Sequence, residues 1–496
     1  MNISIHNLSF RYVEAVEPTL DLLTATFGKG WTGIVGENGA GKSTLMKILS
    51  GELTDFTGHV EGKLNAMYCS QASDVPPDNM EDFALDYSND VIRLKDLLKI
   101  KDDWLWRFDT LSYGERKRIQ IGAALYLAPR VLALDEPTNH LDVISKGIVL
   151  EALQNYDGVG LLVSHDRNFL DSLVYQCLFL RKGRGTLIGG AYSQAKEELE
   201  IRRVTAQRER QNAQQELSRV KMESQRRSVQ ASRSASRLSA RNLDKKDSDG
   251  RAKRRLAVYT GQDGKTGLLS SQMDKKVEHA QERLRNATVQ KTYNGQLEIN
   301  TKALKRKCII QKEAGEILLG ESCTLTYPDI FVGGSDKIGL WGPNGSGKST
   351  FLHTLLSEEH DFYTLFIPQE LSGDQGKELL RKIKQRSQSD LGLLLSIVAR
   401  LNSSPDRILS GDELSPGELR KIMLAEGLIN QPSLVVMDEP TNHLDIHSIE
   451  ALQDVLASCE CALMIVSHDK QFLDALADIR WEFTFEDDAH SQLTIC

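Results

Sequence analysis

The sequence lacks the features that mark membrane-embedded proteins. No run of about 18 uncharged apolar residues, the length that a membrane-spanning helix needs, occurs in the 496 residues. The first residues, MNISIHNLSFRYVE, are polar and acidic where a signal peptide would carry an apolar stretch. We therefore expect a protein that neither crosses nor enters a membrane.

Cysteine is also scarce. The seven cysteines are an odd number, lie far apart and form no pair of CxxC motifs, so the pattern predicts neither a disulfide framework nor a cysteine metal site. Cys459 and Cys461 precede the apolar run ALMIV, where free buried thiols are common, which favours packing over a redox role. This usage is typical of a reducing compartment, and we expect a cytoplasmic protein.

Charge is unevenly distributed along the chain. Residues 191–300 contain 24 Lys and Arg against 14 Asp and Glu, a balance of +10, although the whole chain carries −8 and the remaining residues therefore −18. Such asymmetry favours a polyanionic partner that is approached by the middle segment.

Four motifs occur twice, which indicates one duplicated domain. GENGAGKST and GPNGSGKST are offset by 306 residues, and three further pairs are offset by 303. Those pairs are LSYGE with LSPGE, LALDEPTNHLD with VVMDEPTNHLD, and VSHDRNFLD with VSHDKQFLD. We expect domains at 1–190 and 301–496, joined by a linker at 191–300.

Each half reads as an α/β domain with a largely parallel sheet. The apolar runs WTGIV and KIGLW precede the glycine loops, and VLALDE and LVVMDE contain the acidic pairs; such runs are typical of buried parallel strands. Apolar residues at helical spacing follow each GKST. The order of strand, glycine loop and helix is the one that a phosphate-binding unit requires.

The linker is predicted to form an antiparallel helical hairpin. No proline or glycine occurs from 193 to 242, which predicts a long exposed helix. The returning stretch places Met273, Val277, Ala280 and Leu284 at spacings of four and three, as in a coiled-coil seam. Between them, a glycine-rich tip at about 243–270 carries four candidate RNA-binding residues, Arg251, Lys253, Arg254 and Arg255.

The repeated motifs carry phosphate chemistry. A GxxxxGK[ST] loop turns successive N–H groups toward phosphate oxygens, so that Lys42 and Lys348 would reach the β- and γ-phosphates of a nucleotide. Two full matches in this context make a merely structural turn a poor explanation. The candidate Mg²⁺ ligands are Ser43, Gln71, Asp135, Ser349, Gln369 and Asp438.

Two pairs of residues are candidates for catalysis. Glu136 and Glu439 directly follow the strand aspartates, where a carboxylate can polarise the attacking water. His165 and His468 follow the apolar strands GLLVSH and LMIVSH, where an imidazole can hydrogen-bond a γ-phosphate. A single histidine at a strand end would more often be structural, but two in equivalent positions favour function.

In this order, twice over, the motifs resemble ATP-binding cassette domains. Two cassettes with EPTNHLD and a charged helical linker resemble the ABC-F family of ribosome-associated ATPases over essentially the whole chain. The resemblance implies that the cassettes of one monomer close head to tail around two ATP molecules, with Ser415 and Gly417 completing the site of Lys42, and Ser112 and Gly114 that of Lys348. The expected ATP-binding residues are Tyr12, Gly36, Asn38, Gly39, Gly41, Lys42, Ser43, Thr44, Ser112, Gly114, Gly342, Asn344, Gly345, Gly347, Lys348, Ser349, Thr350, Ser415 and Gly417.

The resemblance also implies a partner. In this family the linker enters the ribosome from the tRNA exit site and reaches toward P-site tRNA and the peptidyl-transferase centre. A basic hairpin suits contact with an RNA phosphate backbone. We therefore expect rRNA and tRNA, and not DNA, as partners.

Three departures from the family pattern are present. In the signature motifs LSYGE and LSPGE, Tyr113 and Pro416 occupy the position usually held by glycine. Pro416 also lacks an N–H. Tyr12 can stack on adenine in the first site, whereas the equivalent count in the second half reaches Leu318. The glutamine loops contain Gln71 and Gln369, and they lie only 41 and 46 residues before the signature motifs LSYGE and LSPGE. This distance leaves little room for the arm, an insertion that some family members carry there.

Several functions share these residues. A substantial linker without an arm resembles the branch that protects ribosomes from antibiotics, and relief of stalled ribosomes without a drug role fits equally. The ATPase subunit of a transporter shares the cassette chemistry but gives the basic hairpin no role. DNA-repair ATPases usually have far longer coiled coils or zinc cysteines.

Overall fold

The computed structural model describes most of the chain. It describes all residues except 1, 14, 16, 63–64, 140, 239–261, 288–303, 305, 321–322, 359, 370–372, 404, 406–407, 409–413 and 488–489. The chain divides into two compact units, one of Met1–Ala195 with Tyr293–Cys496 and one of Lys196–Thr292. We call residues 1–195 the first cassette, residues 293–496 the second cassette, and the other unit the hairpin.

The first cassette is built on a six-stranded sheet in the order β5-β6-β7-β3-β8-β9. All neighbours are parallel except β8 and β9. The strands are β3 (Gly30–Gly36), β5 (Ala66–Cys69), β6 (Val131–Asp135), β7 (Val159–Val163), β8 (Val174–Arg181) and β9 (Arg184–Gly189). Because the parallel strands β3, β6 and β7 end at one edge, the polar residues that follow them gather there.

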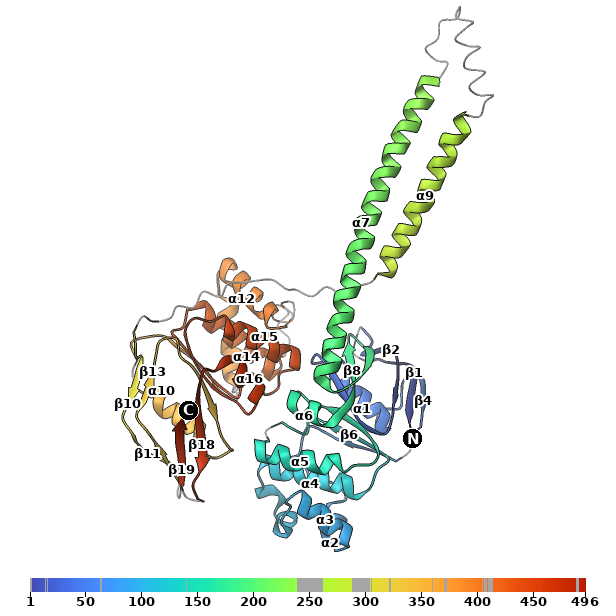
Figure 1. The fold of residues 1–496 in the computed structure, drawn as a ribbon. Coiled ribbons are helices and arrows are strands. Elements are labelled where there is room, and N and C mark those ends of the chain that lie inside the picture. The colour runs from blue at the N-terminus through green and yellow to red at the C-terminus, as the bar shows by residue number, and fades with distance from the viewer. Residues whose placement is uncertain are drawn as a thin grey trace, which may run out of the picture. The chain divides into compact units, whose positions relative to one another are not determined.

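Helices surround this sheet (Figure 1). They are α1 (Lys42–Ser50), α2 (Met80–Leu85), α3 (Asn89–Leu97), α4 (Tyr113–Tyr126), α5 (Val143–Gln154) and α6 (Arg167–Leu173), with 3₁₀ turns η1 (Asp102–Trp106) and η2 (Phe108–Thr110). Phe83, Trp104 and Phe108 form a separate small core with the buried face of α4. The signature motif at the start of α4 is thereby tied to its own helical layer.

A three-stranded antiparallel sheet precedes the parallel one and was not anticipated from the sequence. β1 (Ile3–Phe10) pairs with β2 (Leu20–Phe27) on one side and β4 (Thr57–Glu61) on the other. Its inward side chains share one core with α1 and the central sheet. The sheet therefore fixes Tyr12, just after β1, next to the phosphate loop.

The second cassette repeats the plan with an eight-stranded sheet in the order β11-β12-β19-β18-β14-β17-β16-β15. Its strands are β11 (Gly315–Leu319), β12 (Cys323–Tyr327), β14 (Lys337–Trp341), β15 (Thr364–Ile367), β16 (Leu434–Asp438), β17 (Ala462–Val466), β18 (Ile479–Phe485) and β19 (His490–Ile495), with β10 (Ile310–Lys312) and β13 (Ile330–Val332) as a separate pair. Its helices are α10 (Lys348–Leu356), α11 (Gly373–Lys384), α12 (Gln388–Arg400), α14 (Pro416–Ile429), α15 (Ile446–Ala457) and α16 (Lys470–Leu476). The predicted α/β fold class with duplicated domains is confirmed, and Cys459 and Cys461 are buried in its core.

The hairpin consists of α7 (Tyr192–Leu238) and α9 (Gln262–Asn286), which run side by side in opposite directions (Figure 1). Arg283 Nη1 donates to Glu216 Oε2 at 2.9 Å and so joins the two helices. The half-buried positions of α7 recur at spacings of three and four, at Arg203, Ala206, Arg210, Ala213, Leu217 and Val220. Met273 and Ala280 of α9 are buried, so α7 and α9 meet along the predicted seam.

The structure places the C-terminal part of the predicted tip in a helix. Residues 262–270 were expected in the tip but belong to α9, where Gly264 and Gly267 are tolerated at about 1 kcal/mol each. Residues 239–261, with Arg251, Lys253, Arg254 and Arg255, lie outside the described residues. Among the helices that the structure describes, none has both the length and the apolar character of a membrane span.

One of two hydrophobic cores in the described part of the second cassette contains Phe351 of α10. This side chain is fully buried, and its ring lies 5.3 Å from that of Tyr327, 5.9 Å from Trp481 and 5.8 Å from Phe483, in edge-on geometry. Such pairs add to the free energy gained by burial.

We predict that Phe351→Ala lowers the free energy of unfolding of the second cassette by about 3–5 kcal/mol, because it opens a cavity in this aromatic cluster. Urea titration of the full-length protein followed by tryptophan fluorescence measures the change. Phe331→Ala is the matched control, since Phe331 is 58% exposed in the same cassette and its loss is expected to change stability by less than about 0.5 kcal/mol. Equal effects of the two substitutions would contradict the assignment of the core.

Candidate active site

The phosphate loop of the first cassette connects β3 to α1. It turns through Gly41, whose φ of 96° is left-handed, a conformation that residues with a Cβ rarely adopt. A Cβ at Gly41 would also lie 2.9 Å from the Leu20 side chain. Because α1 begins at the next residue, Lys42, its first N–H groups are available to an anion in the loop.

Lys42 is buried inside this loop. Its Nζ donates to the carbonyls of Gly36 at 2.8 Å and Glu37 at 3.1 Å. Burial lowers the pKa of Lys42, and the carboxylates of Glu136 and Asp445 oppose that shift. The ammonium is thus positioned before any phosphate arrives.

The second cassette has the same loop between β14 and α10. Lys348 Nζ donates to the carbonyls of Gly342 at 2.8 Å and Pro343 at 2.7 Å, and Gly347 has a φ of 93°. Burial lowers the pKa of Lys348 too, against the opposing charge of Glu439. The two predicted lysines therefore have equivalent surroundings.

Each phosphate loop lies near the aspartate that ends the next strand but one in the sheet, β6 in the first cassette and β16 in the second. Ser349 Oγ donates to Asp438 Oδ2 at 2.6 Å, and Asp438 Oδ1 is buried without a hydrogen-bond partner among the described residues. In the first cassette, Asp135 Oδ2 accepts from Tyr68 Oη at 2.9 Å. A serine hydroxyl beside a carboxylate with an unsatisfied oxygen suits Mg²⁺, which prefers oxygen ligands.

The glutamate after each aspartate has a left-handed backbone, with φ of 50° at Glu136 and 46° at Glu439. The bend turns the Glu136 carboxylate toward His165, whose Nε2 lies 2.9 Å from Glu136 Oε1. The backbone N–H of His165 donates to the other carboxylate oxygen at 3.2 Å. The structure thus brings together a glutamate and a histidine that are 29 residues apart in the chain.

The equivalent pair in the second cassette is looser. His468 Nε2 lies 3.4 Å from Glu439 Oε1 and makes its shorter contact, 2.9 Å, to Oδ1 of Asn344 in the phosphate loop. Oε1 of Glu439, like Oε1 of Glu136, has no hydrogen-bond partner among the described residues, so the two pairs differ in the distance to the histidine and in the other contact that the histidine makes.

The two glutamates consequently differ in acidity. Burial alone raises the pKa of a carboxyl group, but at Glu136 the charges of His165 and Lys42 outweigh burial and hold the pKa below its ordinary value. At Glu439 burial prevails and raises the pKa to about 7. Burial also lowers the pKa of His468 to about 3. The first glutamate is therefore ionised at neutral pH, whereas the second is poised near neutrality beside an uncharged histidine.

Both signature motifs begin a helix with a capping box. Ser112 is the N-cap residue of α4 and Ser415 that of α14, and each hydroxyl accepts from the backbone N–H of the glutamate three residues later. Pro416 occupies the first turn of α14, where a helix needs no N–H from that residue. Tyr113 instead turns its Oη to the carbonyl of Gln71 at 2.7 Å.

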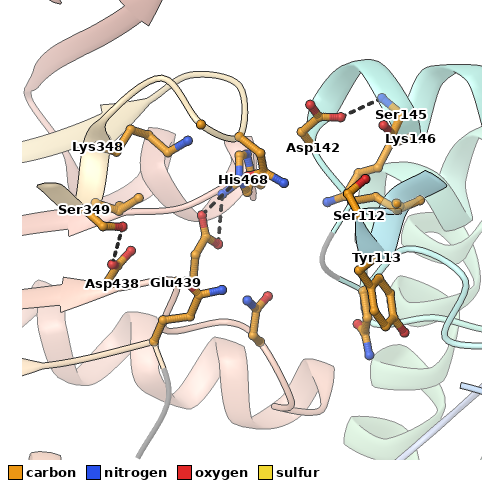
Figure 2. A pocket seen from close by; sticks show the side chains of 18 of the residues that line it. Ser112, Tyr113, Asp142, Ser145, Lys146, Lys348, Ser349, Asp438, Glu439 and His468 are labelled. Carbon is orange, nitrogen blue, oxygen red and sulfur yellow. Dashed lines mark hydrogen bonds and ion pairs between the residues drawn. The ribbon is translucent and has the colours of Figure 1, made fainter. Parts of the chain in front are cut away.

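Two cavities combine residues from both cassettes. One, of about 800 Å³, brings Lys42, Ser43, Gln71, Asp135 and Glu136 together with Ser415 and Gly417; we call it the first site. The other, of about 910 Å³, brings Lys348, Ser349, Gln369, Asp438, Glu439 and His468 together with Ser112 and Gly114; we call it the second site (Figure 2).

The adenine side differs between the sites. Tyr12 lines the first site, is 44% exposed and is held by a 3.1 Å hydrogen bond between its Oη and Thr44 Oγ1. In the second site, Leu319 and Gly320 line the cavity, whereas Leu318, the position reached by counting, is 74% exposed. Leu318 and Leu319 are consecutive residues of β11, and their side chains therefore point to opposite faces of the sheet.

The first phosphate loop contacts the second cassette. Asn38 of this loop donates from its backbone N to Asp445 Oδ2 at 3.1 Å and from its side chain to the His443 carbonyl at 3.2 Å. In the second phosphate loop, Oδ1 of the counterpart Asn344 lies 2.9 Å from His468 Nε2 of its own cassette.

One pair of functional positions escaped sequence reasoning. Lys117 donates to the carbonyls of Ser70 and Gln71 at 2.8 and 3.1 Å, and Arg420, 303 residues later, donates to the Gln369 carbonyl. Both basic residues fix the glutamine loop to the signature helix. The sequence contained one signal for this pair, a basic residue at the same position of both halves, 303 residues apart.

Fold and site together define a twin ATP-binding cassette ATPase. A family model described as "ABC transporter" matches residues 23–139 and 332–442. The chain is 30% identical to ATP-binding protein Uup of Caulobacter vibrioides over 90% of this chain and 71% of that protein. It is 26% identical to ribosome protection protein VmlR of Bacillus subtilis, over 89% and 79% of the two chains. For energy-dependent translational throttle protein EttA of Escherichia coli K12 the identity is 27%, over 90% and 85%.

The chain belongs to the ABC-F family of twin-cassette ATPases, whose cassettes bind ATP with Mg²⁺ and hydrolyse it. The fold is shared with a solved structure titled "Model of ribosome-bound archaeal Pelota and ABCE1", with a TM-score of 0.63 at 18% identity, covering 98% of this chain and 78% of that chain.

We predict that Lys42→Ala and Lys348→Ala each weaken ATP binding at one site by roughly ten- to a hundredfold, because each removes a charged hydrogen-bond donor from a phosphate loop. Titration with a fluorescent ATP analogue measures the loss. Lys29→Ala is the control, since Lys29 is 61% exposed and pairs with Asp157. Unchanged affinity in the double variant Lys42→Ala/Lys348→Ala would contradict the assignment of both loops.

Proposed function

We propose that this protein is an ATP-dependent translation factor that binds the ribosome through its hairpin. In this proposal the hairpin enters from the tRNA exit site and its tip contacts rRNA and P-site tRNA near the peptidyl-transferase centre. The observation that carries the proposal is the combination of two composite ATP sites with a basic hairpin in one chain.

The cassettes supply the ATP-dependent step. Lys42 and Lys348 bind phosphate oxygens, and the signature serines Ser415 and Ser112 complete the sites from the opposite cassette when the two close. Glu136 and Glu439 polarise water for attack, with His165 and His468 at the terminal phosphate. Bound Mg²⁺, held by residues such as Ser349 and Asp438, supplies charge neutralisation on the phosphates.

The hairpin supplies the ribosome contact. Residues 191–300 carry a net +10, and an unbroken helix, α7, of 47 residues spans roughly 70 Å at 1.5 Å per residue. Contact of such a surface with RNA is dominated by phosphates and is weakly sequence-specific. Two relatives are named for ribosome protection and for translational throttling, which supports a role in translation.

Within this function we favour protection of the ribosome from antibiotics. The protein would act in the cytoplasm as a monomer, with the tip displacing a drug from the peptidyl-transferase region. Relief of stalled ribosomes without a drug uses the same residues and is the alternative outcome of the experiment below.

We predict that the double variant Glu136→Gln/Glu439→Gln hydrolyses ATP at least about a hundredfold more slowly, since it loses both bases, and that with ATP it sediments with ribosomes through a sucrose cushion. Phosphate release and the ribosome pellet are the two measurements.

Two controls bracket this result. Glu482→Gln, an exposed position on β18, should hydrolyse normally, and the double variant with added Lys42→Ala/Lys348→Ala should remain in the supernatant. If the ATP-loaded double glutamate variant stays apart from ribosomes, the proposed function is wrong.

We predict that expression in a susceptible host raises the minimal inhibitory concentration of at least one drug among macrolides, lincosamides, pleuromutilins and phenicols. Replacing Arg251, Lys253, Arg254 and Arg255 together with alanine should remove the increase, because the tip then loses phosphate contacts. No change for any drug with the native sequence would reject protection in that host and favour the drug-free alternative.

A further inference from the structure

Lys146 gives the two ATP sites different charge. It lies in the first turns of α5, after the helix-capping residue Asp142, and its side chain is 19% exposed. The residue lines the second site, on the wall that the first cassette contributes, across from Lys348, Glu439 and His468 (Figure 2). A cation on the opposite wall of a phosphate-binding cavity can reach a bound polyphosphate.

Among the described residues, no cation occupies the equivalent position in the first site. The 303-residue offset that relates the two motifs places Ile449 at the position of Lys146, and Ile449 is buried. The signature helices do not create the difference, because Arg118 lines the second site and Lys421, at the same offset, lines the first. Lys146 is therefore an unmatched positive charge at this position.

Lys146 is already positioned by an ion pair with Asp166. Its Nζ donates to Asp166 Oδ2 at 2.7 Å. Asp166 also caps α6, because its Oδ1 accepts from the Phe169 N–H at 3.0 Å. The capping bond leaves Asp166 in place if the lysine moves, so that the ammonium can exchange one carboxylate oxygen for a phosphate oxygen at little cost to α6.

Lys146 shares the second site with Glu439 and His468, and its charge affects the acidity of both. Burial raises the pKa of Glu439, and Lys146 is among the cations that oppose the rise. Burial likewise lowers the pKa of His468, and Lys146 adds to that shift. Glu439 and His468 are the residues assigned to the reaction end of the second site, and Lys146 lines the same cavity from the opposite wall (Figure 2).

We propose that Lys146 is a nucleotide-binding residue of the second site, supplied by the first cassette, that contacts the terminal phosphate of ATP and has no counterpart in the first site. The second site thereby distinguishes triphosphate from diphosphate more strongly than the first. The proposal rests on the composite ATP sites and does not depend on ribosome binding.

The test isolates each site in the full-length protein. Lys42→Ala/Glu439→Gln weakens binding at the first site, so that the second site binds first, and blocks hydrolysis at the second site. Lys348→Ala/Glu136→Gln does the same in favour of the first site. Lys146→Met, which keeps the length of the side chain and removes the charge, and Lys146→Arg, which keeps the charge, are added to both. Dissociation constants are measured with a fluorescent ATP analogue and the matching ADP analogue.

In the second-site background, Lys146→Met should weaken binding of the ATP analogue roughly tenfold or more, as expected for a lost charged contact, and binding of the ADP analogue far less. Lys146→Arg should restore most of the loss. In the first-site background, neither substitution should change either constant appreciably.

The other outcomes each reject the proposal. Since Asp166 directly follows His165 of the first site, a purely structural role for Lys146 as a brace would weaken the first site as much as the second. Equal losses for the ATP and ADP analogues, an arginine variant as weak as the methionine variant, or no loss at all would show that Lys146 does not contact the terminal phosphate. None of these results depends on ribosomes, so the proposed translation function is tested separately.

Discussion

A buried ammonium needs oxygen partners, and this requirement shapes both phosphate loops. Lys42 and Lys348 each donate to the two carbonyls at the start of their own loop, which ties the first turn of the helix to the end of the strand. Positive φ at the glycine before each lysine makes this closure possible. Parallel strands that end at the same edge then bring the aspartate, glutamate and histidine to the ammonium.

Two copies of this arrangement do not behave identically. In the first cassette His165 makes its short contact to Glu136, whereas in the second cassette His468 makes its shorter contact to Asn344. Arg167 of the first cassette places its Nη2 3.7 Å from Asp469 Oδ2 and its Nη1 3.9 Å from Glu450 Oε1 of the second cassette. Its counterpart Lys470 is exposed. Differences at a few contact residues thus give a duplicated fold two distinct catalytic environments.

Sequence reasoning anticipated the parts that depend on local pattern. The strands ending at Asp135 and Asp438 were visible because their residues are buried on both faces, and the loops because glycine spacing determines their path. The β1-β2-β4 sheet was not visible, since its pairing joins residues as far apart as Ser4 and Glu61. The partners of Asn344 and the wall that Lys146 lines depend on how distant segments pack, which no local pattern encodes. Counting from Tyr12 reached Leu318 and not Leu319, which lines the cavity, because the offset between the two halves is not constant along the chain.

The left-handed backbone at Glu136 and Glu439 has a consequence for protein stability. A non-glycine residue in this conformation carries strain of order 1–3 kcal/mol, and glycine would relieve it while removing the carboxylate. At these two positions, a substitution that raises the stability of the fold therefore removes the group needed for ATP hydrolysis. A lineage that kept only the clamp and gave up the reaction would find glycine there a favourable replacement.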